Sequence, residues 1–384
     1  MPVAIPVLTP ADAAAWDARA EAGGISLDTL MGSAGRGAAA VLLDRFPHVV
    51  RQGVLVAAGP GNNGGDGWVL ARALQHLGVP VWVVAVEGAG NALRAHAEAL
   101  ARGDGVRTVA IDGPWPAVAL LVDALLGTGA SGPPRGAVAA AIERLRDLDL
   151  PTCAIDGPTG LDLETGVSYG APTAECSITF GGLRRGHLLA RDESGDIIVI
   201  DIGLPPPDGS LPELVTDDHA AQWLPAFTAR EHKGSRGRVV IVGGAPGMAG
   251  AVRMAGRAAF AAGAGLVHLV SPAASLSGLG AAEPDLQTAP WDDGPPPQPV
   301  AELFARASAL VVGPGLGRTS DTRRRVEMAL AASPDVPVVL DADALIAFQG
   351  DADALRPLLV GRAAVLTPHL GEFRALFPGL SAGI

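Results

Sequence analysis

Short hydrophobic runs that end in glycine or aspartate alternate, in the first half of the chain, with longer segments rich in alanine, leucine and arginine. The runs are continuously apolar, which is typical of strands buried on both faces of a parallel sheet. The alternation predicts an open, three-layer α/β domain with helices on both faces of its sheet. Strands are expected within residues 54–59, 79–88, 107–112, 119–127, 152–157, 176–182 and 197–203.

Two helices are predicted ahead of the first of these strands. The stretches TPADAAAWDARA and SLDTLMGSAGRGAAAVLLDRF each place a hydroxyl residue, Thr9 or Ser26, before a run rich in alanine or leucine. A serine or threonine side chain at this position accepts a hydrogen bond from a free backbone amide of the first helical turn. Both residues are therefore predicted N-caps.

The same alternation returns after a proline-rich break at residues 203–210, GLPPPDGS. This stretch can neither continue a strand nor begin a helix, so we predict two domains, 1–210 and 211–384. The segment DDGPPPQPV, residues 292–300, is predicted to be a surface loop of the second domain. Strands of that domain are expected within residues 237–244, 264–272, 309–317, 336–345 and 363–372.

Composition and charge narrow the class of protein. A chain of 384 residues can bury the cores of two domains, and no apolar run approaches the roughly 18 residues of a membrane-spanning helix. The N-terminus lacks the basic region and apolar core of a signal peptide, and the net charge of −12 argues against a nucleic-acid or membrane partner. We expect a cytoplasmic protein with a small-molecule ligand, in which Cys153 and Cys176 pack as small hydrophobic residues.

The stretch GPGNNGGDG, residues 59–67, lies between a predicted strand and a predicted helix. Its glycines fit the GxGxxG fingerprint, and Glu87 ends the next strand, where a ribose-binding carboxylate is expected; a nicotinamide-linked dehydrogenase is therefore one alternative. Asp66 argues against it, since we place this carboxylate in the first helical turn, where it would compete with a pyrophosphate. A turn built from glycines with polar caps is the other alternative.

Two further motifs place polar residues at strand ends. VDALLGTGASGPPRG closes a strand with Asp123 and continues into an amide-rich loop, residues 127–133, of the kind that cradles anionic or polyhydroxyl ligands. AIDGPTGLDLETG closes another with Asp156, and Thr159 follows. Open α/β sheets bind ligands at the carboxyl ends of their strands, so the three motifs together predict one binding site.

These motifs resemble the NAD(P)H-hydrate repair proteins, in which an epimerase domain precedes an ADP-dependent dehydratase domain with a ribokinase-like fold. The resemblance covers nearly the whole chain. It implies a Rossmann-like epimerase domain at 1–210 and a ribokinase-like dehydratase domain at 211–384. Besides the three motifs, it is carried by LMGSAG (30–35), TFGGLRRGHL (179–188), HKGSRGRVVIVGG (232–244), GMAGAVRMAGRAAFAAGAGLV (247–267), EPDLQT (283–288), VVGPGLG (311–317), LDADAL (340–345) and LTPHLGEF (366–373).

The resemblance implies substrates and site residues for the epimerase domain. The substrates are NADHX and NADPHX, the hydrates formed when water adds across the reduced nicotinamide ring. The resemblance also implies a potassium ion held by Asn63, Asp123 and Thr159, and oxygen ligands suit such a hard cation. The implied contacts to the hydrate are Asn62, Asn63, Gly64, Gly65, Asp66, Gly127, Thr128, Gly129, Ala130, Ser131, Gly132, Pro133 and Asp156.

Asp156 is the predicted catalytic residue. Loss of the ring hydroxyl, assisted by the ring nitrogen, leaves an iminium-like cation, and addition of water to the other face inverts the carbon. A buried carboxylate can move the proton and stabilise the positive charge. Arg184 stands where the family commonly has lysine; arginine stays charged near neutral pH, so we leave it out of the catalytic set.

For the second domain the resemblance implies hydrate contacts at Ala251, Gly317 and His369, and ADP and Mg²⁺ as cofactors of a complete dehydratase. No GxGD motif follows His369. We therefore expect an incomplete dehydratase domain and no dehydratase turnover from these 384 residues. The alternatives are a non-catalytic nucleotide-binding or scaffolding protein and a ribokinase-like kinase, which the missing motif disfavours. We also expect a homo-oligomer.

Overall fold

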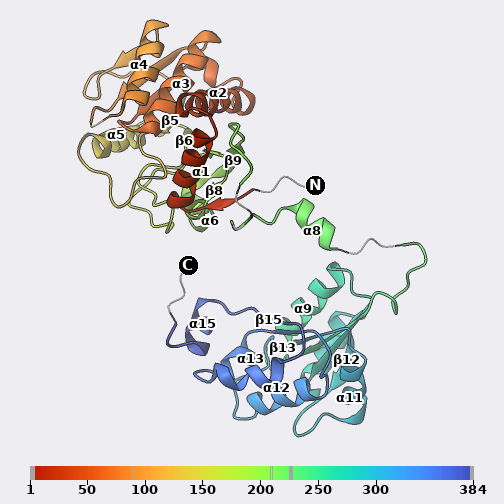
Figure 1. Cartoon of the computed structure of the whole chain (residues 1–384). Helices are drawn as coiled ribbons and strands as arrows, with labels where there is room; N and C mark the ends of the chain where they lie inside the picture. Colours follow the sequence, from red (N-terminus) through yellow and green to blue (C-terminus); the bar gives the residue numbers. More distant parts are fainter. Residues whose placement is uncertain (1–4, 89, 208, 210, 225–227, 381–384) are drawn as a thin grey trace. The chain divides into compact units, whose positions relative to one another are not determined.

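The computed structural model describes residues 5–88, 90–207, 209, 211–224 and 228–380, which belong to two compact units (Figure 1). The first unit runs to Leu224, beyond the proline-rich break. The reason is that the chain after the break returns to the N-terminal segment. The Val7 amide donates to the Pro212 carbonyl and the Leu214 amide to the Ile5 carbonyl, each at 2.8 Å.

The first unit contains a seven-stranded parallel sheet with the strand order β4-β3-β2-β5-β6-β7-β9. A small second sheet pairs β1 with β8. The strands are β1 (Val7–Leu8), β2 (Val54–Ala58), β3 (Val81–Ala85), β4 (Arg107–Val109), β5 (Leu120–Ala124), β6 (Thr152–Ile155), β7 (Cys176–Phe180), β8 (Leu183–Arg184) and β9 (Asp196–Ile200). The helices are α1 (Pro10–Ala22), α2 (Leu27–Arg45), η1 (Val50–Gln52), α3 (Asn62–His76), α4 (Ala92–Gly103), α5 (Gly136–Asp147), α6 (Arg185–Leu189), α7 (Arg191–Ser194) and α8 (Asp217–Trp223).

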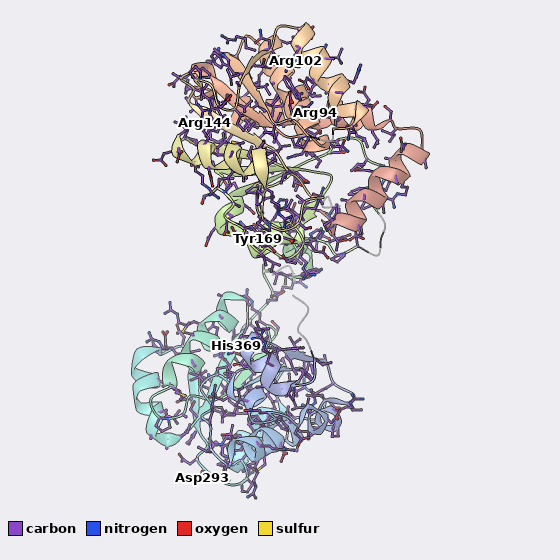
Figure 2. The ribbon with its side chains drawn as sticks, turned by 90° about the vertical axis from the view of Figure 1, so that its left-hand side faces the viewer. Arg94, Arg102, Arg144, Tyr169, Asp293 and His369 are labelled. Carbon is purple, nitrogen blue, oxygen red and sulfur yellow. The ribbon has the colours of Figure 1, made fainter. Side chains whose placement is uncertain are left out.

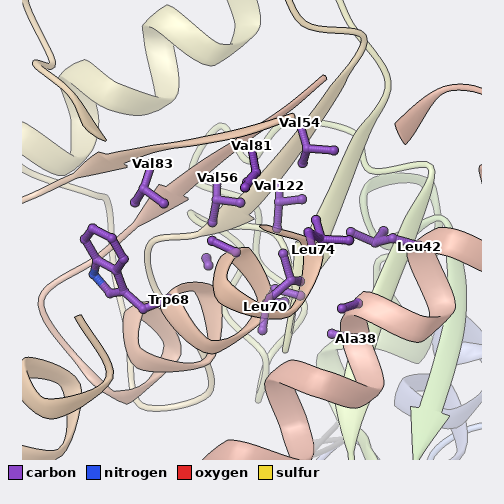
Figure 3. Close-up of a cluster of buried hydrophobic side chains, with 14 of the residues drawn as sticks. Ala38, Leu42, Val54, Val56, Trp68, Leu70, Leu74, Val81, Val83 and Val122 are labelled. Carbon is purple, nitrogen blue, oxygen red and sulfur yellow. The ribbon is translucent and has the colours of Figure 1, made fainter. Parts of the chain in front are cut away.

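Alternate residues of the buried strands serve opposite faces of this sheet. Val54 and Val56 of β2 pack with α2 and α3, whereas Leu55 between them packs with α5. Figure 3 shows Trp68, Leu70 and Leu74 of α3 against the valines of the central strands. The predicted three-layer arrangement is confirmed, and Thr9 and Ser26 are the N-caps of α1 and α2.

The second unit has a six-stranded parallel sheet with the order β12-β11-β10-β13-β14-β15. One face packs on α9 and α10, and the other packs on α11, α12, α13 and α15. The strands are β10 (Arg238–Val242), β11 (Leu266–Ser271), β12 (Gln287–Pro290), β13 (Ala309–Val312), β14 (Val338–Leu340) and β15 (Ala364–Leu366). The helices are α9 (Ala249–Ala261), α10 (Ala273–Ala282), α11 (Gln298–Ala305), α12 (Thr322–Ala331), α13 (Asp343–Ile346), η2 (Ala352–Ala354), α14 (Arg356–Leu359) and α15 (Leu370–Leu376).

Sequence patterns missed three of these strands. The edge strand β12 has the mixed composition QTAP, and β1 and β8 have only two residues each, too few for a periodic signal. The predicted loop at residues 292–300 gives way to α11 at Gln298. Cys153 and Cys176 are buried free thiols, as expected; they lie opposite each other on β6 and β7, and the Cys176 thiol donates a hydrogen bond to the Cys153 sulfur, 3.3 Å away.

In each of the two large sheets the strand order reverses direction once. The chain passes from β2 outward to β3 and β4 and then returns to β5; in the second unit it passes from β10 outward to β11 and β12 and returns to β13. Ligands of open α/β sheets bind at such reversal points, outside the carboxyl ends of the strands. Among the described residues, no helix is long and apolar enough to cross a membrane.

Trp68 is fully buried between α3 and the sheet. Replacing it with alanine leaves a large cavity, so Trp68→Ala should lower the free energy of unfolding by about 3–5 kcal/mol. Denaturant titration followed by far-UV circular dichroism would measure this. Trp223→Ala, at a tryptophan that is 69% exposed, is the matched control and should change stability by less than about 0.5 kcal/mol. Equal effects of the two substitutions would contradict the proposed core.

Candidate active site

A cavity of about 560 Å³ lies at the carboxyl ends of the first unit's central strands. The loops that follow β2, β5 and β6 form its floor, and α1 and α2 contribute apolar residues, among them Leu30 and Met31. Its rim includes Asn62 and Asn91, whose side-chain amides are hydrogen bonded at 2.6 Å. The cavity therefore opens at the point where the strand order reverses between β2 and β5.

Asp156 follows β6 and carries the most heavily bonded carboxylate of the cavity. One carboxylate oxygen accepts hydrogen bonds from the amide of Thr128, at 2.5 Å, and from the Thr128 hydroxyl. The other lies 3.4 Å from a guanidinium nitrogen of Arg184 and 3.4 Å from the Thr179 hydroxyl. Asp156 also has φ +66°, a left-handed conformation that is uncommon for residues other than glycine, although asparagine and aspartate adopt it more often than most. Such strain often occurs at functional sites.

Arg184 and His187 fix the position of Asp156. Arg184 is buried and donates from Nε to the Thr128 hydroxyl oxygen, 2.8 Å away, and from a terminal nitrogen to the Gly182 carbonyl. The Nε2 of His187 lies 2.6 Å from the Asp156 carbonyl oxygen and its Nδ1 accepts from the Arg184 amide. His187 thereby fixes the backbone of both members of the ion pair.

The electrostatics of the cavity floor favour an ionised Asp156 and a neutral His187. Burial alone would raise the pKa of Asp156, but the Arg184 guanidinium and the Thr128 hydrogen bonds outweigh it, and the pKa is lowered. Burial lowers the pKa of His187 to about 4. A neutral imidazole agrees with its hydrogen bonds, one donated and one accepted.

The three predicted potassium ligands lie around the loop after β5, which also contacts Asp156, and of the three Asn63 lines the cavity. Asp123 ends β5 and accepts hydrogen bonds from the amide and hydroxyl of Thr159, both at 2.7 Å. The Thr159 hydroxyl also accepts from the Leu126 amide. Asn63 comes from α3, and both polar atoms of its side chain are buried without a hydrogen-bond partner in the described part of the protein. A buried amide in this state has hydrogen-bonding capacity left for a ligand, an ion or a water molecule.

Asp66 corrects one prediction. Because α3 begins at Asn62, Asp66 is its fifth residue and not part of its first turn. The prediction that its carboxylate competes with a pyrophosphate at the N-terminus of the helix was therefore wrong. The side chain instead lines the cavity. Burial, and next the charges of Asp156 and Asp17, raise its pKa well above the ordinary value.

Several predicted contact residues have packing roles. A Cβ at Gly64 would lie 1.9 Å from the Gly59 carbonyl oxygen, and one at Gly65 would lie 2.4 Å from the Met31 side chain. In the loop after β5, residues 127–130 line the cavity, whereas Ser131, Gly132 and Pro133 are outside its lining. The Thr128 and Ala130 amides are already bonded within the protein, to Asp156 and to the Gly127 carbonyl.

Sequence reasoning did not identify Asp17. It lies on α1, exposed at the edge of the cavity that it lines, and burial raises its pKa. The indole of the preceding Trp16 donates to the Pro205 carbonyl at 2.8 Å and fixes this part of α1. No motif surrounds Asp17, so only its place in the fold could reveal it.

In the second unit, the three predicted contacts all follow the carboxyl ends of strands. Ala251 is in α9, close to the loop after β13, since a Cβ at Gly315 would lie 3.2 Å from the Ala251 Cβ. Gly317, in the same loop, has φ +88° and donates its amide to Asp343 at 2.9 Å. His369 follows β15, is labelled in Figure 2, and caps α15 by accepting from the Gly371 and Glu372 amides.

Among the described residues, no group of three or more histidines, cysteines, aspartates and glutamates could hold a metal ion. The Asn63, Asp123 and Thr159 set contains one carboxylate. Such a set suits a hard monovalent cation better than a transition metal.

Comparisons with known proteins agree with this architecture. Residues 27–186 match the family described as YjeF-related protein N-terminus, and residues 239–382 match the family described as NAD(P)H-hydrate dehydratase. The chain thus falls in a class of proteins that join a YjeF-related α/β domain to an α/β domain of the NAD(P)H-hydrate dehydratase type.

Curated relatives resemble both units at once. The bifunctional NAD(P)H-hydrate repair enzyme Nnr of Salinibacter ruber is 38% identical over 395 residues, which cover 92% of this chain and 71% of the relative. The enzyme of the same name from Escherichia coli is 35% identical, over 91% of this chain and 67% of the relative. The chain belongs to the bifunctional NAD(P)H-hydrate repair enzyme family.

Two solved structures resemble single parts of the chain. A yeast protein, ynu0, is 23% identical, with a TM-score of 0.46 over 59% of this chain and 96% of its own. The ADP/ATP-dependent NAD(P)H-hydrate dehydratase of Bacillus subtilis, co-crystallised with ATP and Mg²⁺, is 28% identical, with a TM-score of 0.34 over 42% of this chain and 55% of its own.

The raised pKa of Asp66 predicts a pH-dependent cost to stability. The unfolded chain ionises near the ordinary value of 3.8 and the folded chain only at higher pH, so stability falls as the pH rises from the unfolded to the folded pKa. Asp66→Asn removes this loss, which is about 1.4 kcal/mol for each unit of pKa difference. The melting temperature of the variant should exceed that of the wild type by a few degrees near pH 7 and converge with it near about pH 4.

Thermal unfolding across this pH range would measure the effect. Asp147→Asn, at an exposed aspartate of α5, removes the same charge and should produce no such divergence. A variant at Asp66 that is less stable than the wild type near neutral pH would show that its carboxylate has a stabilising partner.

Proposed function

We propose that the first unit interconverts the R and S epimers of hydrated NADH and NADPH. The observation that carries the proposal is the carboxylate of Asp156, held ionised at the floor of the cavity by Thr128 and Arg184. The names of the curated relatives, which are NAD(P)H-hydrate repair enzymes, support this substrate class. Preference between NADHX and NADPHX is outside the proposal.

Asp156 stabilises the charge that the reaction creates. When the hydroxyl leaves the hydrated carbon, the ring nitrogen contributes its electron pair and the ring becomes cationic. A carboxylate that is already ionised and fixed by hydrogen bonds needs no reorganisation to face this cation. The apolar walls from α1 and α2 exclude bulk water around part of the ring and strengthen the attraction.

A potassium ion fits the residues beside this floor. Asn63 offers a buried side-chain oxygen without a partner, and Asp123 and Thr159 offer a carboxylate and a hydroxyl that the strand-end loops hold together. When bound, the ion would supply positive charge for the oxygen atoms of the substrate. Asn63, Asp123 and Thr159 would then fix the loops after β5 and β6 relative to α3.

For the second unit we propose that the same hydrate contacts Ala251, Gly317 and His369, with ADP and Mg²⁺ as dehydratase cofactors. The support is that all three follow carboxyl ends of strands, Ala251 and Gly317 after β10 and β13 at the reversal point and His369 after the edge strand β15. A cytoplasmic location and a homo-oligomer stay predictions.

Asp156→Asn should reduce epimerisation by at least about 100-fold, because it removes the fixed negative charge from the floor. Asparagine tolerates the left-handed backbone of this position, so the fold should persist. In the assay, the purified protein is mixed with one epimer and the epimer ratio is followed by chromatography. The measured quantity is the rate of interconversion in excess of the spontaneous rate. Asp147→Asn controls for the loss of a charge, and full activity of Asp156→Asn would remove Asp156 from the mechanism.

Epimerisation should depend on potassium and fall when choline replaces it at constant ionic strength. Asn63→Ala and Thr159→Val should each raise the potassium concentration needed for half-maximal activity by about tenfold or more, since each removes a proposed ligand. Potassium should also raise the melting temperature of the wild type and have less effect on both variants. Equal rates and melting temperatures in potassium and choline would exclude this site.

A further inference from the structure

The carboxyl groups of Asp17, Asp66 and Asp156 all line the cavity but differ in their partners. Both oxygens of Asp156 are engaged, by Thr128 and by Arg184 and Thr179. In the part of the chain that the structure describes, the carboxyls of Asp17 and Asp66 accept no hydrogen bond and form no ion pair. Asp156 repels both carboxyls, and the more distant charge of Arg184 attracts Asp17.

This arrangement makes Asp156 a poor carrier of protons. A proton on its carboxylate would remove the charge that balances buried Arg184 and would compete with the two donors of Thr128. Asp156 therefore serves best as a permanent anion, and the proton transfers of the reaction require another group.

Inversion of the hydrated carbon has a geometric requirement. A proton must reach the hydroxyl oxygen on one face of the ring, and a proton must leave the incoming water on the opposite face. One carboxyl group in a fixed position cannot contact both faces. Two groups on different walls of the cavity meet the requirement.

Asp17 and Asp66, whose carboxyls accept no hydrogen bond from the described residues, come from different helices. Asp66 is on α3, which the buried Trp68 holds against the sheet. Asp17 is on α1, which is fixed by the N-cap at Thr9 and by the hydrogen bond from Trp16 to the Pro205 carbonyl. Both helices contribute to the cavity lining, and the charged groups that face them there are each other, Asp156 and Arg184.

We propose that Asp66 and Asp17 are catalytic residues that exchange protons with the substrate on opposite faces of the ring, while Asp156 stays ionised. This inference rests on the proposed function. Protonated Asp66 donates its proton to the hydroxyl oxygen, the carbon–oxygen bond breaks with its electron pair going to oxygen, and water leaves. The nitrogen electron pair forms the carbon–nitrogen double bond of the cation.

A second water then adds to the other face. Its oxygen forms a bond to the carbon, the electrons of the double bond return to nitrogen, and ionised Asp17 takes the proton. Asp66 ends ionised and Asp17 ends protonated, which is the state required to convert the opposite epimer. Proton exchange with solvent at the cavity edge, where Asp17 is exposed, restores the starting state.

The test compares Asp66→Asn, Asp17→Asn and the control Asp147→Asn. Each protein is incubated with the R or the S epimer in water enriched in oxygen-18. Chromatography with mass spectrometry measures two rates above the spontaneous background: formation of the other epimer, and entry of the label into the starting epimer. Melting temperatures and equilibrium binding of the hydrate establish that each variant folds and binds.

Each catalytic variant should lose interconversion by about 100-fold or more, because one of the two proton transfers is missing. The remaining carboxyl can still expel the hydroxyl on its own face and return water to that face. Asp17→Asn should therefore keep label exchange in one epimer and Asp66→Asn in the other. Asp147→Asn should match the wild type in both rates.

Three results would overturn the inference while the wild type remains an epimerase. The first is that Asp66→Asn or Asp17→Asn interconverts the epimers as fast as Asp147→Asn does. The second is that both variants keep label exchange in the same epimer. The third is that both variants lose label exchange in both epimers. The last would assign a merely structural role to the two aspartates. A wild type that does not epimerise the hydrate would overturn the proposed function, and this inference with it.

Discussion

The close approach of two backbone segments at the reversal point of the first sheet is the constraint on which the site depends. A Cβ at Gly59 would lie 1.8 Å from the Leu125 carbonyl oxygen, so only glycine permits this contact. The Gly59 amide donates to the Ala124 carbonyl at 3.0 Å and joins the ends of β2 and β5. Because α3 begins three residues later, Asn63 reaches the loop after β5, where a Cβ at Gly127 would already lie 3.2 Å from the Asn63 Cγ.

Much of the fold could be predicted because continuous apolar runs and glycine-rich strand ends are local signals. The residues that the motifs predicted, Asn63, Asp123, Asp156 and Thr159, lie together for the same reason: parallel strands bring their carboxyl ends to one edge. Pairing of β1 with β8 joins segments far apart in sequence through two residues each, Leu8 opposite Arg184. Such non-local contacts leave no periodic pattern, so the placement of α1 over the cavity could not be predicted.

The role of Arg184 follows from its burial. A lysine in this position could lose its proton when desolvated, whereas arginine keeps its charge. The guanidinium also has enough donors to bond Thr128 and the Gly182 carbonyl while it faces Asp156. Arg184 thus favours the ionised form of Asp156 and, unlike a lysine, does not donate a proton near neutral pH. Proton transfer must then come from groups without such partners.

In the sheet of the second unit, two strand ends also approach each other closely through a glycine, but the side chains around them are different. A Cβ at Gly243 would lie 2.1 Å from the Pro314 carbonyl oxygen, so the ends of β10 and β13 also meet through glycine. Here the acidic residue that holds the loop after β13 is Asp343, at the start of α13, and its carboxylate accepts from the Gly317 amide and from Arg318. The hydrogen bonds of the Asp343 carboxylate hold the loop after β13 in one conformation. The backbone of Gly317 is therefore held in place independently of any ligand, whereas the buried amide of Asn63 in the first unit has no partner of its own among the described residues.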